Sequence, residues 1–407
     1  MRNKEIQLEN VREYFPSLQR KIKGKRVIYF DGPGGTQVPK RVISAISNYY
    51  RYYNTNTHGQ FQSSIQTDRI IDDARKNIAT FLGAEGPSTI SIGQNMTTLN
   101  FALSHAFSKI FNRGDEVVIT QLDHEANRGP WLSLRANGVK VKEVSLLPGG
   151  VLDYNDFKNK VSENTRLVAL GWASNALGTI NDLKLARELT YKTGAYLLVD
   201  AVHYAPHFPI DVQSIGMDFL LCSSYKFYGP HLGFLYSKPD MLDQLPVDRL
   251  STQRQYTPYK IETGTLNHAA LAGVNATIAF LSSLGTGNNI RDKLQNGMRS
   301  INHHEQKLAR RLMQGLQTIK KLKMIGPDVD QIPRAPTISF VHETLSPTEV
   351  CSKLAMHNIS AWDGHFYARK AMEVLGLQER GGVTRIGISM YNNDDDIDKL
   401  LKILRSL

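Results

Sequence analysis

Cysteine is scarce in this sequence, since Cys222 and Cys351 are the only two in 407 residues. Two cysteines cannot form a framework of several disulfides, nor can they supply a four-thiolate zinc site. We therefore predict a chain without structural disulfides and without a metal site. Low-complexity segments and internal repeats are also missing, which argues against disordered and solenoid architectures.

Long apolar runs are missing as well. No segment approaches the roughly 20 apolar residues that a membrane-spanning helix needs. The first residues, MRNKEIQLEN, are charged from the second position and lack the apolar core of a signal peptide. These features predict a cytoplasmic protein that does not associate with membranes.

Motifs for nucleic-acid binding are not present, although 49 basic residues stand against 38 acidic ones. The basic residues are scattered, and the densest clusters are RKIKGKR and IKKLK. No zinc finger, RNP-like motif or clear helix-turn-helix accompanies them. We attribute the net charge of +11 to solvated helix faces and to attraction of anionic substrates, and we predict no nucleic-acid partner.

The middle of the chain alternates short apolar runs with longer amphipathic segments. Several of the runs are apolar at nearly every position, which is typical of parallel strands buried on both faces. This alternation predicts an α/β fold with a mostly parallel sheet wrapped by helices. The runs are STISIGQN, DEVVITQ, VKVKEVSL, TRLVALGW, AYLLVDA, DFLLCSS and LGFLY.

A change of pattern at LGTGNN, residues 284–289, predicts a domain boundary. A long amphipathic helix follows from residue 290, and then a strand, a helix and a strand in APTISFVH, PTEVCSKLAMHN and TRIGISMY. We predict a large domain over residues 26–287. Residues 1–25 and 288–407 are predicted to form a smaller α+β domain.

Two of the predicted strands lead to residues that are suited to catalysis or to cofactor binding. Asp200 ends AYLLVD, and Lys226 follows the next strand in the segment CSSYKFYGP. A buried lysine loses basicity and becomes a usable nucleophile. The two residues could form a structural salt bridge. Alternatively they could bracket pyridoxal phosphate, which needs a lysine for its Schiff base and a carboxylate on its pyridine nitrogen.

The neighbouring loops carry further polar residues. His124 and Asn127 follow one strand, and Asn175 follows another. Thr97 and Thr98 lie in a turn that opens a helix, where backbone N–H groups hold phosphates. Each residue also has a structural explanation: His124 as a core histidine, Asn175 as a turn residue, and the threonines as helix caps.

An ordered series of motifs resembles the class V branch of fold-type I pyridoxal-phosphate enzymes, and within it the cysteine desulfurase-like proteins. The resemblance runs from about Tyr29 to the C-terminus. It implies a mostly parallel seven-stranded sheet in the large domain and pyridoxal 5′-phosphate as the cofactor. The motifs are YFDGPGGTQVP, GQNMTTLN, LDHEANRGPW, SNALGT, VDAVHYAPH, SSYKFYGPHLG, ETGTLNH and TRIGISMYN.

The resemblance also implies roles for individual residues. Lys226 forms the Schiff base, Asp200 binds the pyridine nitrogen, and His124 stacks on the cofactor ring. His203 stands where the family usually has a glutamine that bonds the phenolic oxygen, a task that an imidazole N–H can also perform. Arg385 holds the α-carboxylate of an amino-acid substrate, for which a bidentate fork is suited.

The remaining implied contacts concern the phosphate, the substrate and a second subunit. Thr265 resembles a phosphate ligand that the family donates from the partner subunit, which implies a homodimer with shared active sites. The other cofactor contacts are Asn95, Met96, Thr97, Asn175, Ser223 and Tyr225, and the other substrate contacts are Asn175, His58 and Tyr367.

One position departs from the desulfurase pattern. Desulfurases accept sulfur on a cysteine in the loop before the last strand, and here Tyr367 stands at that place. A phenol cannot form a persulfide, so we expect Tyr367 to line the pocket. We predict cleavage of a C–S or related C–X bond of an amino acid by Cα deprotonation and β-elimination. The alternatives are an epimerase, racemase or aminotransferase on the same scaffold, or a non-catalytic binding or regulatory protein.

Overall fold

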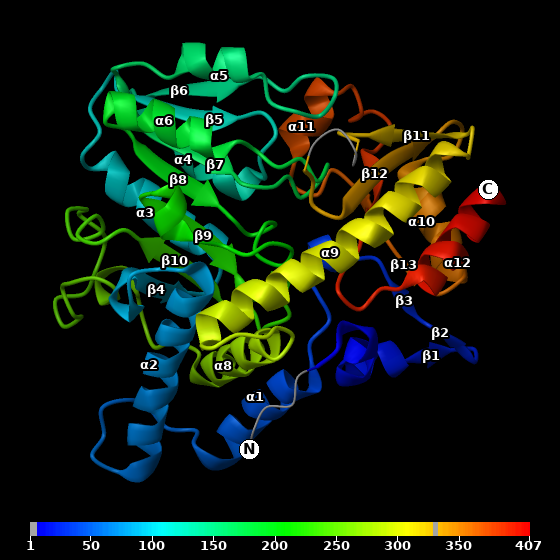
Figure 1. The fold of residues 1–407 in the computed structure, drawn as a ribbon. Helices are drawn as coiled ribbons and strands as arrows, with labels where there is room; N and C mark the ends of the chain where they lie inside the picture. Colours follow the sequence, from blue (N-terminus) through cyan, green and yellow to red (C-terminus); the bar gives the residue numbers. More distant parts are fainter. Residues whose placement is uncertain (1–5, 329–332) are drawn as a thin grey trace.

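The larger part of the protein is built around a seven-stranded sheet, seen in the computed structural model (Figure 1), which describes residues 6–328 and 333–407. The strand order is β4-β10-β9-β8-β7-β5-β6. Neighbours from β9 to β6 are parallel, and β10 is antiparallel to β4 and β9. The predicted mostly parallel sheet of seven strands is therefore confirmed. The strands are β4 (Ile90–Gly93), β5 (Glu116–Thr120), β6 (Lys140–Val144), β7 (Thr165–Gly171), β8 (Tyr196–Asp200), β9 (Phe219–Ser223) and β10 (Gly233–Ser237).

Helices cover both faces of this sheet, because its strands are apolar on both faces. In β5, Val117 and Ile119 pack into one apolar cluster and Val118 packs into the other. The first cluster contains side chains of α3 and α4, and the second contains side chains of α2, α6 and α8. The helices of this part are α1 (Lys40–Tyr52), α2 (Gln62–Leu82), α3 (Met96–Ser108), α4 (Gly129–Leu132), α5 (Tyr154–Lys160), α6 (Leu183–Thr193), α7 (Val212–Ile215) and α8 (His268–Ser282).

The residues that follow the long helix α9 (Ile290–Gln317) form a smaller antiparallel sheet of four strands (Figure 1). Its strand order is β11-β12-β15-β14. The predicted long helix and the predicted strand, helix and strand after it are confirmed. Ile28 and Phe30 pack into the core of this sheet. Its elements are β11 (Leu322–Ile325), β12 (Thr337–His342), α10 (Pro347–Met356), β14 (Trp362–Gly364), α11 (Arg369–Val374), β15 (Val383–Gly387) and α12 (Asp394–Arg405), with the pairs β1 (Lys21–Ile22) and β2 (Lys25–Arg26), and β3 (Ile28–Tyr29) and β13 (Ile359–Ser360).

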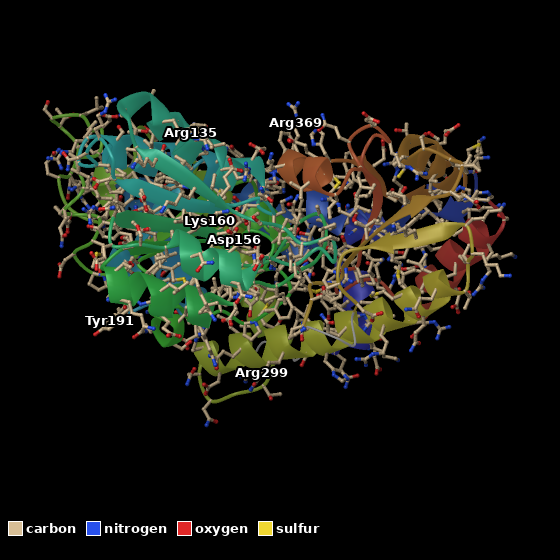
Figure 2. All side chains as sticks on the ribbon, turned by 90° about the horizontal axis from the view of Figure 1, so that it is seen from above. Arg135, Asp156, Lys160, Tyr191, Arg299 and Arg369 are labelled. Atoms are coloured by element: carbon tan, nitrogen blue, oxygen red, sulfur yellow. The ribbon has the colours of Figure 1, made fainter. Side chains whose placement is uncertain are left out.

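Charged side chains are spread over separate elements of the surface. Lys160 and Asp156 lie side by side on α5 (Figure 2), and their side chains pair at 2.6 Å. The guanidinium of Arg135 lies 3.3 Å from the carboxylate of Glu143. Arg369 begins α11 in another part of the molecule. Among the described residues, no helix is both long enough and apolar enough to cross a membrane.

Candidate active site

A cavity of about 950 Å³ opens where the parallel strands of the large sheet end, as expected for an α/β sheet. Loops after β5, β7, β8 and β9 meet there with Trp362 and Arg385 of the small sheet. The structure thus brings together residues that the family resemblance assigned to one site. The predicted site residues in the cavity wall are Asn95, Met96, Thr97, His124, Asn175, Asp200, His203, Ser223, Tyr225, Lys226, Tyr367 and Arg385.

Lys226 reaches the cavity from a single 3₁₀ turn, Ser224–Lys226, that follows β9 directly. Its amine donates to the carbonyl of Pro33 and lies 4.8 Å from the ring centroid of Tyr225. Burial, together with the positive charge of Arg385, lowers the pKa of Lys226 to about 7. A large fraction of this amine is therefore neutral and nucleophilic at neutral pH.

Asp200 ends β8 and is buried. Its Oδ1 accepts a hydrogen bond from the backbone N–H of Val202 at 2.9 Å. Burial raises the pKa of Asp200 to about 7, and the neighbouring carboxyl of Asp123 contributes. Within residues 6–328 and 333–407, no ion pair joins Asp200 to Lys226, so the structural salt bridge considered from the sequence is not formed. A buried carboxyl of this kind gains by binding a cation.

Asp123 is a site residue that sequence reasoning missed, although it directly precedes His124. It accepts hydrogen bonds from the N–H of Gly171 at 3.1 Å and from Nδ2 of Asn127 at 3.0 Å. Burial raises its pKa to about 6. Asp123 thus ties the loop after β5 to the end of β7 and fixes the loop that carries His124.

His124 is held neutral. Its Nδ1 accepts a hydrogen bond from the backbone N–H of Ala126 at 3.0 Å, which also fixes the orientation of the ring. Burial, with the charges of Lys226 and Arg385, lowers its pKa to about 4. The ring stacks against that of Tyr367 with centroids 5.3 Å apart. A neutral, fixed imidazole suits stacking on an aromatic ligand.

The first turn of α3 forms a cradle for an anion. Asn95 caps the helix by accepting from the N–H of Thr98 at 2.9 Å, and the N–H of Met96 donates to Oγ of Ser223 at 3.0 Å. A Cβ at Gly233 would collide with the backbone of Asn95, so glycine is needed for this close approach. The helix N-terminus and the Ser223 hydroxyl together favour a phosphate.

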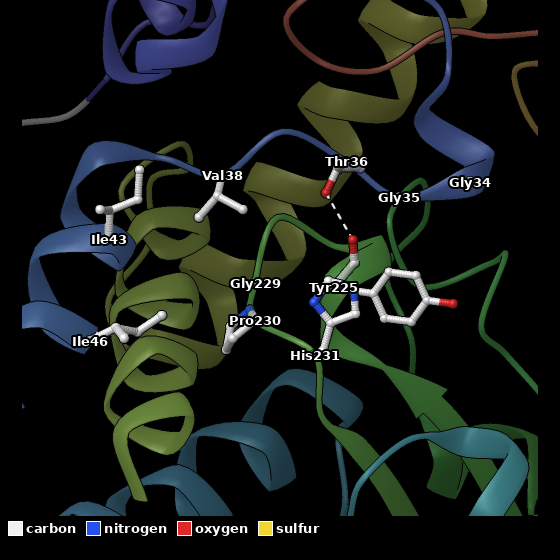
Figure 3. A pocket seen from close by; sticks show the side chains of 10 residues that line it. All are labelled: Gly34, Gly35, Thr36, Val38, Ile43, Ile46, Tyr225, Gly229, Pro230 and His231. Carbon is white, nitrogen blue, oxygen red and sulfur yellow. Dashed lines mark hydrogen bonds between the residues drawn. The ribbon is translucent and has the colours of Figure 1, made fainter. Parts of the chain in front are cut away.

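The loop after Lys226 forms one wall of a neighbouring hollow (Figure 3). The rings of Tyr225 and His231 stack nearly parallel, with centroids 4.7 Å apart. The hydroxyl of Thr36 donates to the carbonyl of Tyr225 at 3.3 Å (Figure 3). This contact connects the Gly34–Gly35 turn to the loop that carries Lys226. His231 was not singled out in the sequence and also lines the main cavity.

Arg385 lies on β15 with its guanidinium buried. It donates to the carbonyl of Asn175 at 2.9 Å, and the ring centroid of Phe366 lies 3.8 Å from its Cζ. Burial lowers its pKa to about 9. In the part of the chain that the structure describes, Nε of Arg385 and Oδ1 of Asn175 are buried without a hydrogen-bond partner. These two atoms are enclosed by protein, so it is the rest of each side chain that faces the cavity.

Tyr367 and Phe366 form a rim over the cavity. Both have left-handed backbone conformations, with φ of 58° and 51°. The carbonyl of Tyr367 accepts from the N–H of Glu125 at 2.7 Å, and the carbonyl of Phe366 accepts from Nδ2 of Asn175 at 2.8 Å. The rim is therefore bonded to the loops that carry His124 and Asn175.

Two predicted residues lie away from the cavity. His58 is 68% exposed in the loop before α2, with Nδ1 at 3.3 Å from Oδ1 of Asp68. Thr265 is not in the cavity wall either. Within one chain neither residue therefore contacts the site, and their roles stay predictions. The resemblance assigned Thr265 to the site of a partner subunit.

Together these groups fit pyridoxal phosphate. A nucleophilic lysine, a buried carboxyl, a neutral histidine and an anion cradle line one cavity. Asn175 and Arg385 also line this cavity, so a polar group of a ligand can reach them.

Comparison with known proteins agrees with this geometry. Residues 28–400 match the family Aminotransferase class-V. The chain belongs to this family. Its members are pyridoxal-phosphate enzymes, so the enzyme class and the fold type predicted from the sequence are confirmed.

Individual proteins are similar to this chain over nearly its whole length. A probable cysteine desulfurase of Halalkalibacterium halodurans is 30% identical, over 96% of each chain. The aminotransferase-like protein FGM3 of Gibberella zeae is 32% identical, over 99% of each chain. The solved structure of a cysteine desulfurase from Thermococcus onnurineus is 28% identical and superposes with a TM-score of 0.87, covering 98% of this chain and 97% of that one.

Proposed function

We propose that this protein is a pyridoxal-phosphate-dependent enzyme that cleaves a C–S or related C–X bond of an amino acid by β-elimination. The observation that carries the proposal is Lys226, a buried amine with a pKa of about 7 in the same cavity as Arg385. The similarity to desulfurases of several organisms supports the substrate class.

Each residue has a task in this proposal. Arg385 binds the α-carboxylate with its guanidinium, which lines the cavity. Lys226, as a neutral amine, removes the Cα proton. Asp200 stabilises positive charge on the pyridine nitrogen. The cofactor, when bound, supplies an electron sink for the carbanion.

Neither cysteine lies in the cavity wall. Cys222 and Cys351 are both buried, and burial raises the pKa of Cys351 to about 12. A sulfur-accepting thiolate is therefore missing from the described cavity. We propose release of the leaving group instead of its transfer to an enzyme cysteine.

A panel of substrates tests this function. The holoenzyme is incubated with cysteine, cysteine sulfinate, selenocysteine and S-substituted cysteines, while pyruvate, alanine and sulfide are followed. Pyruvate with release of the β-substituent supports elimination. Recovery of inverted substrate with deuterium at Cα in heavy water would instead indicate an epimerase, and keto acid with the β-substituent intact would indicate an aminotransferase.

We expect Tyr367→Cys to introduce sulfur transfer. Tyr367 is 66% exposed at the rim, so a thiol there stays accessible. With cysteine as substrate, mass spectrometry after thiol alkylation should find a persulfide at position 367. Tyr367→Ser is the matched control, and a persulfide in neither variant would contradict the assignment of the loop.

We also propose a homodimer with shared active sites. Large apolar side chains are exposed around α1 and the start of α2, among them Tyr50, Tyr52 and Phe61. Where such side chains form a continuous surface, that surface is typical of a subunit interface. Light scattering gives the subunit number, and mixing Lys226→Ala with Thr265→Ala subunits tests whether sites are shared, because mixed dimers would regain activity.

A further inference from the structure

A hydrogen bond joins the loop after β8, which carries His203, to the small sheet. Nε2 of His203, which follows β8, lies 2.9 Å from Oγ1 of Thr337, the first residue of β12. The two residues are 134 positions apart, and both are buried. A residue of one sheet thus contacts a histidine at the end of the other.

The hydrogens of this pair can be assigned. Within the described ranges, the Thr337 hydroxyl has no hydrogen-bond partner besides His203. A buried hydroxyl hydrogen needs an acceptor, and Nε2 is the acceptor within reach. The hydroxyl therefore donates to Nε2, which must carry a lone pair.

The ring of His203 is neutral. Burial lowers its pKa well below the ordinary value, and the positive groups around it act in the same direction. A neutral imidazole with a lone pair on Nε2 carries its hydrogen on Nδ1. The titratable and charged neighbours are His207, Arg385, Lys226 and His124.

His207 does not compete for this ring. Its own Nδ1 lies 2.8 Å from Oε2 of Glu305 on α9. The rings of His203 and His207 meet edge to face, with centroids 5.3 Å apart. Thr337 is therefore the side chain that sets the tautomer of His203.

We propose that Thr337 is a positioning residue that holds His203 as the Nδ1–H tautomer and so provides a donor for an anionic oxygen of the bound cofactor. This inference rests on the proposed function for its ligand. His203 lines the cavity, and its Nδ1 has no protein partner among residues 6–328 and 333–407.

The placement of Thr337 connects this donor to the substrate site. On the paired strands β12 and β15, Thr337 stands opposite Gly387 and Ser339 stands opposite Arg385. The position of the small sheet against the large one therefore sets both the place of Arg385 in the cavity and the tautomer of His203.

Nitrogen-15 NMR of the cofactor-free protein tests the tautomer directly. Wild type and Thr337→Ser, which keeps the hydroxyl, should show a protonated Nδ1 and an unprotonated Nε2. Thr337→Val, which keeps the shape, should lower the tautomer ratio by about tenfold. His203→Asn assigns the signals. An Nε2–H tautomer in wild type, or an unchanged ratio in Thr337→Val, would overturn the proposal.

A second measurement uses the reconstituted protein. A hydrogen-bond donor to the phenolic oxygen stabilises the deprotonated form of the bound cofactor and so lowers its pKa. Thr337→Val should therefore move the pH midpoint of its visible absorption upward by about one unit, and Thr337→Ser should not. If Thr337 had a purely structural role, Thr337→Val would lower the melting temperature without moving this pH midpoint.

The two measurements test the tautomer and the proposed function independently of each other. Should the wild-type protein bind no cofactor, the proposed function is wrong, whereas the NMR result still decides the tautomer. If Thr337→Val does not fold, Thr337→Ala replaces it in both measurements.

Discussion

Lys226→Ala is expected to abolish covalent attachment of pyridoxal phosphate and to lower turnover by about 10⁴-fold or more. The variant lacks both the amine that bonds the cofactor and the base that removes the Cα proton. Visible absorption after reconstitution measures the first effect. Mass spectrometry after borohydride reduction locates the adduct in the wild type.

Lys184→Ala is the matched control, because Lys184 is an exposed lysine of α6. It should keep the absorption band and the activity. An adduct on a lysine other than Lys226, or a protein that stays colourless with the cofactor, would contradict the assignment.

The rate of attachment should depend on pH through Lys226. Only the neutral amine attacks, so below the pKa of about 7 the rate should rise about tenfold per pH unit and level off above it. The positive charge of Arg385 lowers this pKa, so Arg385→Gln should move the plateau to higher pH. Stopped-flow absorption across a pH series measures both.

Much of the site could be predicted because it lies at strand ends. Asp200 and Lys226 each follow a buried apolar run, and parallel strands bring their carboxyl ends to one edge. The phosphate cradle was readable from the turn before α3, because a helix N-terminus needs no distant partner. Local patterns therefore sufficed for these residues.

Contacts between distant segments could not be predicted. Thr337 meets His203 across 134 positions, and Phe366 covers Arg385 from a rim with left-handed backbone conformations. Neither periodicity nor spacing encodes such pairs. Asp123 was missed for a different reason, since an acid beside a histidine has no distinctive local pattern.

Arg385→Gln is expected to lower kcat/KM by about 10²- to 10³-fold, because a buried charged pair with the substrate carboxylate is worth roughly 2–5 kcal/mol. The effect should appear mainly in KM, since the carboxylate is bound in both ground and transition states. Steady-state kinetics with the best substrate of the panel measures it.

Arg385→Lys keeps the charge but loses the planar fork, so its loss should be intermediate. A substrate analogue without the α-carboxylate supplies the control, because wild type and Arg385→Gln should handle it equally at a pH above the Lys226 plateau of both proteins. If Arg385→Gln lowered turnover of both compounds to the same extent, the guanidinium would be supporting the fold rather than binding the carboxylate. The packing of Phe366 on this side chain at 3.8 Å makes that comparison necessary, since removing the guanidinium also removes a support of the rim.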